Sequence, residues 1–364
     1  MIRPASMRNA YIFDIRFSEL YRHDKSFVGY TLRGGMTMLR SLLEWFTRIP
    51  LEVQYLVLPL ALIALLCFFP FRCKLSWLVT VLIAAAYLSI LHLSGVWEMA
   101  AGYYTRFLLD LLLVTAAFFA FRKLRGKPFL PRLTPLRIAG TAVCAMLWIF
   151  LLILSVNCLR AYRYEEEPIR LQFPFRNGTF LINDGGDGTI SSLVNYHYQD
   201  EQNTRLGYSR AERYANDIVE LDVWGFEGRH FGRERRLEDY HIYDEVVYSP
   251  CDGVVSTVQE GYPDIQPNTA VTDTGNGVAI RTGDVYVMLW HLKKGSILVR
   301  PGDTVHAGDP LGRIGNSGIT QTPHLHIHAA RVHFLYGVGV PVVYDDKNPV
   351  KNRIMRVSTD GSGG

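Results

Sequence analysis

The sequence is poor in cysteine, and its cysteines lack the spacings that would make them informative. It has five cysteines in 364 residues and no Cys-x-x-Cys pair. Neither a disulfide framework nor a thiolate zinc site can be built from this set. The C-terminal half also lacks a basic stripe interleaved with aromatic residues, which argues against nucleic acid as a partner. Four of the cysteines lie in or beside apolar runs: Cys67, Cys73, Cys144 and Cys158.

A cleavable signal peptide and an internal repeat are likewise missing. The first apolar run starts too far from Met1 for a signal sequence and has no small-residue cleavage site. No period of the solenoid type is present. The sequence therefore predicts neither a secreted precursor nor a repeat protein.

Long apolar runs, by contrast, fill residues 51–159. Each is about the length that crosses a bilayer as a helix, and short polar loops separate them. We therefore expect an N-terminal α-helical membrane domain of about four transmembrane helices. Within the third run, Asp110 follows Arg106 by one helical turn, which predicts an ion pair between them. The four runs cover residues 55–71, 77–96, 107–121 and 138–158.

The charges predict which side of the membrane the C-terminal half occupies. Residues 1–158 carry 17 Lys and Arg against 7 Asp and Glu, whereas residues 159–364 carry 21 against 27. The loop 122–137 has six basic residues and no acid, which is typical of a cytoplasmic loop. Because four crossings return the chain to its starting side, we expect the C-terminal domain outside the cytoplasm.

The N-terminal tail, residues 1–50, opposes that orientation. Residues 1–54 hold eight basic groups and five acids, which favours keeping this end inside. A true translation start at Met36 or Met38 would leave a tail with no net charge. That start is a hypothesis of its own.

The C-terminal half is built of short β-branched and aromatic runs cut by Gly, Asp, Asn and Pro. Their spacing of about ten residues is typical of an antiparallel all-β domain, expected over residues 174–356. Residues 160–173 are polar and charged and are predicted to be a linker. Residues 357–364 are predicted to be a flexible tail.

Three of the eleven histidines, His324, His326 and His328, alternate in the stretch "PHLHIH". In a strand they share one face, with Leu325 and Ile327 on the other. Three neutral imidazoles on a dry surface need a metal ion or a run of hydrogen bonds. The alternation alone leaves both open.

Two rival families fit the preceding stretch "VRPGDTVHAGDPLGRIG". Its paired turns resemble the barrel-sandwich hairpin of biotinyl and lipoyl carriers, but "SPCDGVVSTV" lacks the carrier's lysine. The same type of hairpin occurs in the second family, so a barrel-sandwich-like hairpin is expected with either resemblance. The stretch from Tyr248 to Ala330, including "GNGVAI", "WHL", "GNSG" and "PHLHIH", is similar to lysostaphin/LytM-like zinc metalloendopeptidases. That resemblance implies a zinc enzyme that hydrolyses peptide bonds of bacterial peptidoglycan.

The resemblance also implies roles for the histidines. His326 would bind zinc, while His324 and His291, the histidine of the "HL" strand, would act on the reacting water or the oxyanion. Such a zinc site keeps a position open for water, whose pKa the ion lowers. His328 is expected to orient a ligand rather than to close the site as a fourth one.

The remaining zinc ligands depart from the family's usual His-x-x-x-Asp. In "RYANDIVELD" Asp217 is present, but Arg213 stands where the histidine would be, and arginine cannot bind zinc. A branch of the family with "N.H … YA.D" fits better, because "LVNYH" supplies His197. We therefore expect His197, Asp217 and His326 as ligands. His241, His230 and Asp222 are the reserve candidates.

Together these features predict a zinc-dependent endopeptidase, with Zn²⁺ as cofactor and peptide cross-links or stem peptides of peptidoglycan as substrate. It would be a multi-pass protein of the bacterial cell membrane with its peptidase domain outside the cytoplasm. The alternative is a catalytically inactive scaffold of the same fold that binds and regulates cell-wall enzymes. The missing His-x-x-x-Asp favours the scaffold, whereas the intact His291, His324 and His326 oppose it.

Overall fold

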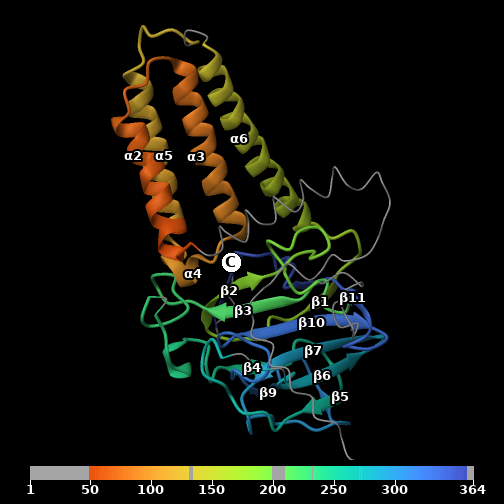
Figure 1. Ribbon diagram of the computed structural model, residues 1–364. Coiled ribbons are helices and arrows are strands. Elements are labelled where there is room, and N and C mark those ends of the chain that lie inside the picture. The colour runs from red at the N-terminus through yellow and green to blue at the C-terminus, as the bar shows by residue number, and fades with distance from the viewer. Residues whose placement is uncertain are drawn as a thin grey trace, which may run out of the picture.

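The protein consists of a helical layer that stands on a larger β domain (Figure 1). The computed structural model describes residues 49–130, 134–198, 210–231, 233–269, 271 and 273–358. The candidate starts Met36 and Met38, most of the N-terminal tail and residues 359–364 lie outside the described residues.

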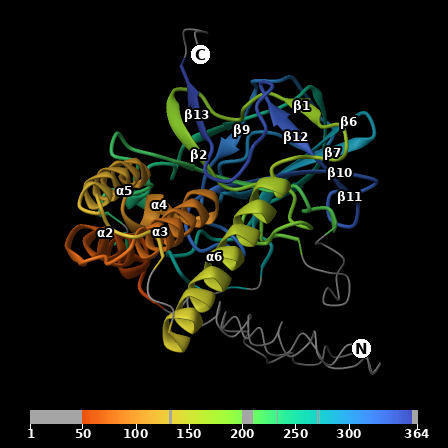
Figure 2. The same ribbon diagram turned by 90° about the horizontal axis from the view of Figure 1, so that it is seen from above.

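The helices coincide with the four apolar runs. Thr134 caps the last long helix by accepting a hydrogen bond from the Arg137 backbone N–H, and a proline follows at the first helical position. In the view from above, α2, α3 and α5 lie close together and α6 runs obliquely beside them (Figure 2). The helical elements are η1 (Val53–Val57), α2 (Leu58–Phe68), α3 (Lys74–Ser94), α4 (Trp97–Ala100), α5 (Thr105–Arg122) and α6 (Pro135–Ala161).

Two of the described helices, α3 and α6, are long and apolar enough to cross a membrane, with mean hydropathies of 1.9 and 2.5. The η1–α2 helix is shorter, and α5 carries three charged residues within its eighteen. Only two of the four expected spans therefore meet the length and composition of a membrane helix within the described part of the chain.

The expected ion pair within α5 is wrong. Asp110 Oδ2 lies 3.0 Å from Nε2 of His92 on α3, so the carboxylate pairs across the bundle. The guanidinium of Arg106 lies over the ring of Tyr103 instead, 4.5 Å from its centroid. The contact between α3 and α5, rather than the spacing of residues along α5, therefore decides the partner of Asp110.

A nine-stranded sheet forms the β domain, and all of its pairings are antiparallel. This confirms the predicted antiparallel C-terminal domain. Its order is β13-β2-β3-β10-β7-β6-β5-β8, with β11 beside β10. The strands are β2 (Gly178–Asp184), β3 (Asn216–Glu220), β5 (Gly253–Gln259), β6 (Asn276–Thr282), β7 (Val285–Leu292), β8 (Thr304–Val305), β10 (Leu325–Arg331), β11 (Val338–Val340) and β13 (Ile354–Val357).

Two small sheets accompany the large one and differ from the expectation. Strand β1 (Ile169–Leu171) arises within the predicted linker and pairs in parallel with β12 (Val342–Tyr344). Strand β4 (Val246–Tyr248) pairs with β9 (Pro310–Arg313). Because β8 pairs with β5 and β9 with β4, the predicted barrel-sandwich hairpin does not form as a pair of adjacent strands.

The register of β10 decides what meets at its centre. His326 lies opposite Asp217 on β3 and opposite Trp290 on β7. Leu325 and Ile327 are fully buried in the main hydrophobic core, so the alternating histidines face the other side. A slip of one residue would turn every histidine into the apolar core.

Two glycine-containing turns fix the end of β7 next to this face. Gly275 has φ of +89°, and a Cβ there would lie 2.3 Å from the carbonyl oxygen of Ser317. The Ser317 hydroxyl accepts a hydrogen bond from the Asn276 N–H and donates one to the Leu292 carbonyl. The turn at Gly275 and the turn at Ser317 are therefore packed against each other through their backbones.

We predict that Gly275→Ala lowers the free energy of unfolding by about 2–4 kcal/mol, because strain at positive φ adds to a backbone collision. The matched control is Gly283→Ala, at φ of +61° with no atom within 4 Å of the added Cβ. It has the strain without the collision, so it should cost about 1 kcal/mol. Denaturant unfolding of the full chain measures both, and equal losses would contradict the prediction.

Candidate metal centre

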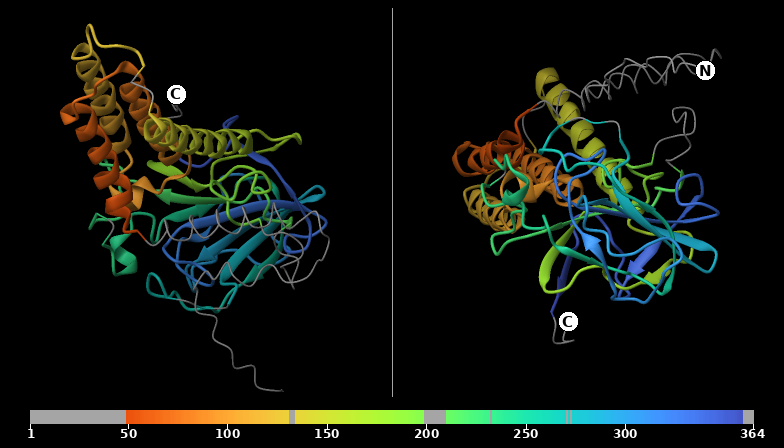
Figure 3. Two further views of the ribbon diagram at one scale, coloured as in Figure 1. Left: turned by 45° about the horizontal axis from the view of Figure 1, so that its top comes forward. Right: turned by 90° about the horizontal axis from the view of Figure 1, so that it is seen from below.

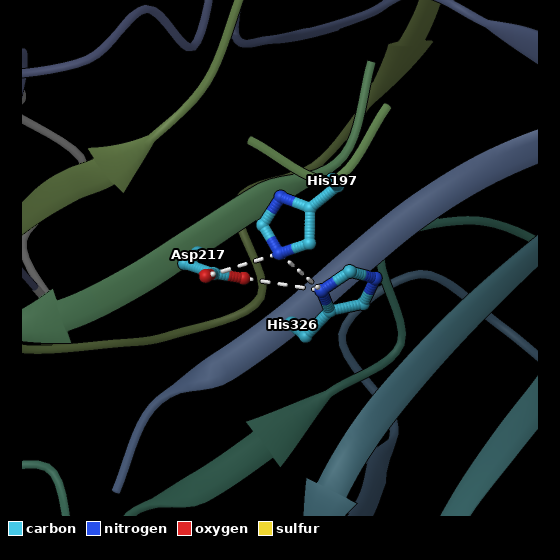
Figure 4. Close-up of side chains that lie close together, drawn as sticks. All are labelled: His197, Asp217 and His326. Atoms are coloured by element: carbon cyan, nitrogen blue, oxygen red, sulfur yellow. Dashed lines mark hydrogen bonds and ion pairs between the residues drawn. The ribbon is translucent and has the colours of Figure 1, made fainter. Parts of the chain in front are cut away.

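Three side chains converge on one face of the sheet: His197, Asp217 and His326 (Figure 4). The Nδ1 atom of His326 lies 3.2 Å from Nε2 of His197 and 3.1 Å from Oδ1 of Asp217. Nε2 of His197 lies 3.3 Å from Oδ2 of Asp217. The structure thus brings together the three residues expected as ligands.

These residues come from three separate parts of the chain. His326 is on β10, Asp217 lies directly across from it on β3, and His197 follows a compact loop after β2. Asp217 and His326 are buried, and the His197 side chain is 10% exposed. The sheet register therefore places two of the groups, and the loop adds the third.

Asn195 fixes the orientation of His197. Its Nδ2 donates to the carbonyls of Gly186, Arg213 and Ala215 at 2.9–3.2 Å, so its Oδ1 must face the histidine. That oxygen accepts from the backbone N–H of His197 and from its Nδ1–H, at 3.1 and 3.0 Å. The proton on Nδ1 leaves Nε2 with a free lone pair directed at the cluster.

A second chain of hydrogen bonds fixes His326 in the same way. Nε2–H of His328 donates to the Phe334 carbonyl at 2.8 Å, since that oxygen can only accept. Nδ1 of His328 must then accept from Nε2–H of His326, at 3.0 Å. This leaves a lone pair on Nδ1 of His326, pointing at His197 and Asp217.

The donor set fits a zinc ion. Two imidazole lone pairs and a carboxylate that face one another repel unless a cation or a proton lies between them. In a tetrahedral site with bonds of about 2.0–2.1 Å, neighbouring ligand atoms lie about 3.3–3.4 Å apart. The observed separations of 3.1–3.3 Å are close to that edge.

The electrostatics of the cluster favour a cation as well. Burial lowers the pKa of His197, but the Asp217 carboxylate outweighs it and raises the pKa to about 9. Burial acts to raise the pKa of Asp217, yet the facing histidines, His197 first, hold it well below its usual range. Positive charge is therefore stabilised at the point where the three side chains meet.

His291 and His324 lie beside the three converging groups. Their rings are 4.7 Å apart, and Nε2 of His324 is 3.6 Å from Oδ1 of Asp217. Nδ1–H of His291 donates to the Ser317 carbonyl, and Nδ1–H of His324 donates to the Thr322 carbonyl, at 2.9 and 2.7 Å. Each Nε2 thus keeps a free lone pair, and burial lowers both pKa values, which favours the neutral form of each ring.

The backbone of His291 is strained. Its φ is +66°, in the left-handed region that residues with a Cβ rarely occupy. The register between β6 and β7 shifts at this residue, because Gly277 pairs with Trp290 and the adjacent Asn276 pairs with Leu292. Such strain is held in place by the turns around Ser317 and is common at functional sites.

Arg213, which stands where the family's usual histidine would be, has a different task. Its Nη2 and Nε donate to Oδ2 and Oδ1 of the buried Asp187 at 2.7 and 3.0 Å. Asp187 is in the loop that carries Asn195, so the ion pair fastens that loop to the segment before β3. The arginine thereby supports the position of His197.

The reserve candidates lie elsewhere. Asp222 accepts the backbone N–H groups of Trp224 and Phe226 in a turn. His230 is exposed and lies 3.3 Å from Asp239. Nε2 of His241 is buried without a hydrogen-bond partner, and no described cluster of possible ligands includes this residue.

Sequence reasoning missed Glu212. Its carboxylate forms a second group of close ligand atoms with His326 and His328, and burial raises its pKa. The orienting role of Asn195 was missed as well, since its motif says nothing of its contacts. The signal for Glu212 is weak, because a single acid five residues before Asp217 has no strand period to support it.

Comparison with known proteins identifies the family of the histidine-bearing part of the chain. The family model described as Peptidase family M23 matches residues 239–336. Residues 239–336 form a peptidase family M23 domain. The match confirms the lysostaphin/LytM resemblance and contains His291, His324, His326 and His328, whereas His197 and Asp217 precede it.

Solved structures show similarity to the M23 domain over part of the chain. A zinc-containing peptidase from Vibrio cholerae is 27% identical over 25% of this chain and 24% of its own, with a TM-score of 0.20. The lysostaphin catalytic domain from Staphylococcus simulans is 19% identical over 29% and 77%, with a TM-score of 0.22. A mutant catalytic domain of the M23 protein EnpA from Enterococcus faecalis is 23% identical over 30% and 77%, with a TM-score of 0.21. The chain thus spans about a quarter of the length of the Vibrio cholerae peptidase.

The raised pKa of His197 predicts a pH dependence of the metal-free fold. Protonated His197 stabilises the folded chain fully below about pH 6.5, and this contribution is lost as the pH rises through 9. In chelator, we expect a loss of about 3 kcal/mol between pH 6.5 and 9.5. The measurement is denaturant unfolding of the full chain and of His197→Gln, and the same slope in both would refute the prediction.

Proposed function

We propose that the protein is a zinc-dependent endopeptidase that hydrolyses peptide bonds of bacterial peptidoglycan, with His197, Asp217 and His326 as the metal ligands. The observation that carries the proposal is the convergence of Nε2 of His197, Nδ1 of His326 and the Asp217 carboxylate at zinc-like spacing. The M23 domain supplies the reaction class, since members of this family are peptidases.

Zinc bound there would act as a Lewis acid that polarises the peptide carbonyl and makes a water molecule more acidic. The chain's own residues would move the protons. His324 is held by Thr322 with its Nε2 lone pair toward the cluster, so it would take a proton from the attacking water and deliver it to the leaving nitrogen. His291, held by Ser317, would donate to the oxyanion once protonated.

His328 is assigned a positioning role. Its ring bonds Nε2 of His326 and the Phe334 carbonyl, so it would act by fixing the proton of His326. Asn195 has the matching role for His197. Glu212, within reach of both His326 and His328, would add negative potential behind the ion.

We further propose that the helices anchor the enzyme in the membrane, with the M23 domain on the outer side. α3 and α6 are long and apolar enough to cross, and many large side chains of α5 and α6 are exposed, among them Phe118, Phe119 and Leu136. A water-facing bundle would not leave such a surface uncovered. The basic connection between α5 and α6 lies at the far end of the helices from the β domain, as a cytoplasmic loop should.

The zinc site is tested by metal content. The full chain purified in detergent should contain about one zinc, and His326→Ala should lose it, because two ligands rarely hold a catalytic ion. His306→Ala is the matched control, since His306 is exposed and lies beside Asp252 rather than in the cluster. Zinc-free wild-type protein would favour the inactive scaffold instead.

Activity separates the proton carriers from the ligands. We predict that His324→Ala keeps its zinc but releases peptides from isolated peptidoglycan about 10²–10⁴-fold more slowly, the usual cost of a lost general acid–base. Product release is followed by chromatography of digests. Zinc binding with wild-type rates in His324→Ala would contradict the assigned role, and zinc binding with no hydrolysis by the wild type would support a scaffold.

A further inference from the structure

A cavity of about 250 Å³ with both polar and apolar lining residues lies where the helices meet the β domain. It is lined from the helical side by the end of α3, the start of α5 and the residue after α6, and from the β domain by the segment before β13. Figure 3 shows how the helical layer meets the β domain. The polar lining residues are His92, Arg106, Tyr162, Lys351, Asn352 and Arg353. None of them belongs to the proposed metal site.

In the proposed membrane location, the ends of α3 and α5 that line the cavity would lie near the lipid headgroups. His92 is two residues before the last residue of α3, and Arg106 is the second residue of α5. Near the same helix ends, Trp97 and Tyr103 are buried within the protein, and Tyr103 donates a hydrogen bond to the Asn352 carbonyl. Any ligand at this depth meets both apolar and hydrated surroundings.

Arg106 brings a positive charge to the cavity, and its guanidinium lies over the rings of Tyr103 and Phe107 rather than against a carboxylate. Arg106 is only 9% exposed, and its Nε and Nη1 are buried without a hydrogen-bond partner. Glu98 influences it electrostatically but forms no ion pair with it among the described residues. A buried guanidinium with free donors is costly unless an anion completes it.

Two of the other residues around the cavity, Lys351 and His92, are paired with carboxylates. Lys351 reaches back to Asp184, 3.6 Å away, and Asp110 pairs with His92. No carboxylate in the described part of the chain pairs with Arg353. Arg106, from α5, and Arg353, from the segment before β13, therefore both line the cavity without an ion pair to a carboxylate among the described residues.

We propose that this cavity binds the phosphate group of an anionic membrane lipid. A phosphate accepts several hydrogen bonds in the fork geometry that guanidinium groups supply, and basic pockets at the ends of membrane helices suit lipid headgroups. Arg106 and Arg353 would hold the phosphate oxygens, and the acyl chains would lie along the exposed apolar surface of the helices. The inference rests on the proposed membrane location and does not depend on zinc or hydrolysis.

The test is a binding titration of the full chain purified in an uncharged detergent. The probes are a short-chain phosphatidylglycerol, the phosphatidylcholine of the same chain length and inorganic phosphate, with the dissociation constants measured by native mass spectrometry. The variant is Arg353→Gln, and its matched control is Arg163→Gln, one residue after Tyr162 and exposed. Arg106→Gln is the second variant, checked for helix content by circular dichroism.

We expect phosphatidylglycerol to bind the wild type and Arg163→Gln equally. Arg353→Gln should bind it at least tenfold more weakly, since one charge-assisted hydrogen-bonding partner is lost. A folded Arg106→Gln should show the same loss. Equal binding of phosphatidylcholine, equal binding of inorganic phosphate, or unchanged binding by Arg353→Gln would each overturn the proposal. Because no outcome uses peptide hydrolysis, failure here is distinct from failure of the proposed enzyme function.

Discussion

The structure depends on keeping two imidazole lone pairs and one carboxylate pointed at the same place. Left alone, such groups would turn apart or take up protons. Asn195 prevents this for His197, and the sequence of hydrogen bonds from the Phe334 carbonyl through His328 prevents it for His326. The Phe334 carbonyl oxygen can only accept a hydrogen bond. Through two successive hydrogen bonds it therefore determines which nitrogen of His326 faces the cluster.

Each part of the β domain can be understood as support for that arrangement. Strand β10 lies between β3 and β7, so one central strand receives Asp217 from one side and His291 from the other. The interlocked turns at Gly275 and Ser317 hold His291 in a backbone conformation it would not choose. Arg213, in place of a ligand histidine, ties down the loop that supplies His197.

Features that arise from local periodicity could be predicted from the sequence, whereas few of those that depend on distant contacts could. Alternation along residues 324–328 placed the histidines on one face, because a strand has no freedom in this respect. His197 could be proposed only from a family resemblance, since nothing local links it to Asp217. The pairing of Asp110 with His92 was missed, because helical spacing points to Arg106 and only the packing of α3 against α5 brings the histidine close. Strand β1 was not predicted, because it lies in a charged stretch and its partner, β12, lies at the other end of the domain sequence.

The end of α6 carries a consequence for how the molecule is divided. The Ala161 carbonyl accepts the Asp187 N–H at 2.8 Å, and Val194, next to Asn195, is buried against Cys158 and Ile90. The loop that carries His197 therefore packs against the ends of α3 and α6. Cutting the chain at residue 160 would remove the helix contacts that support this loop and, with it, the position of His197. The helices and the β domain are therefore not separable modules, because the end of α6 supports the loop that carries one of the three converging side chains.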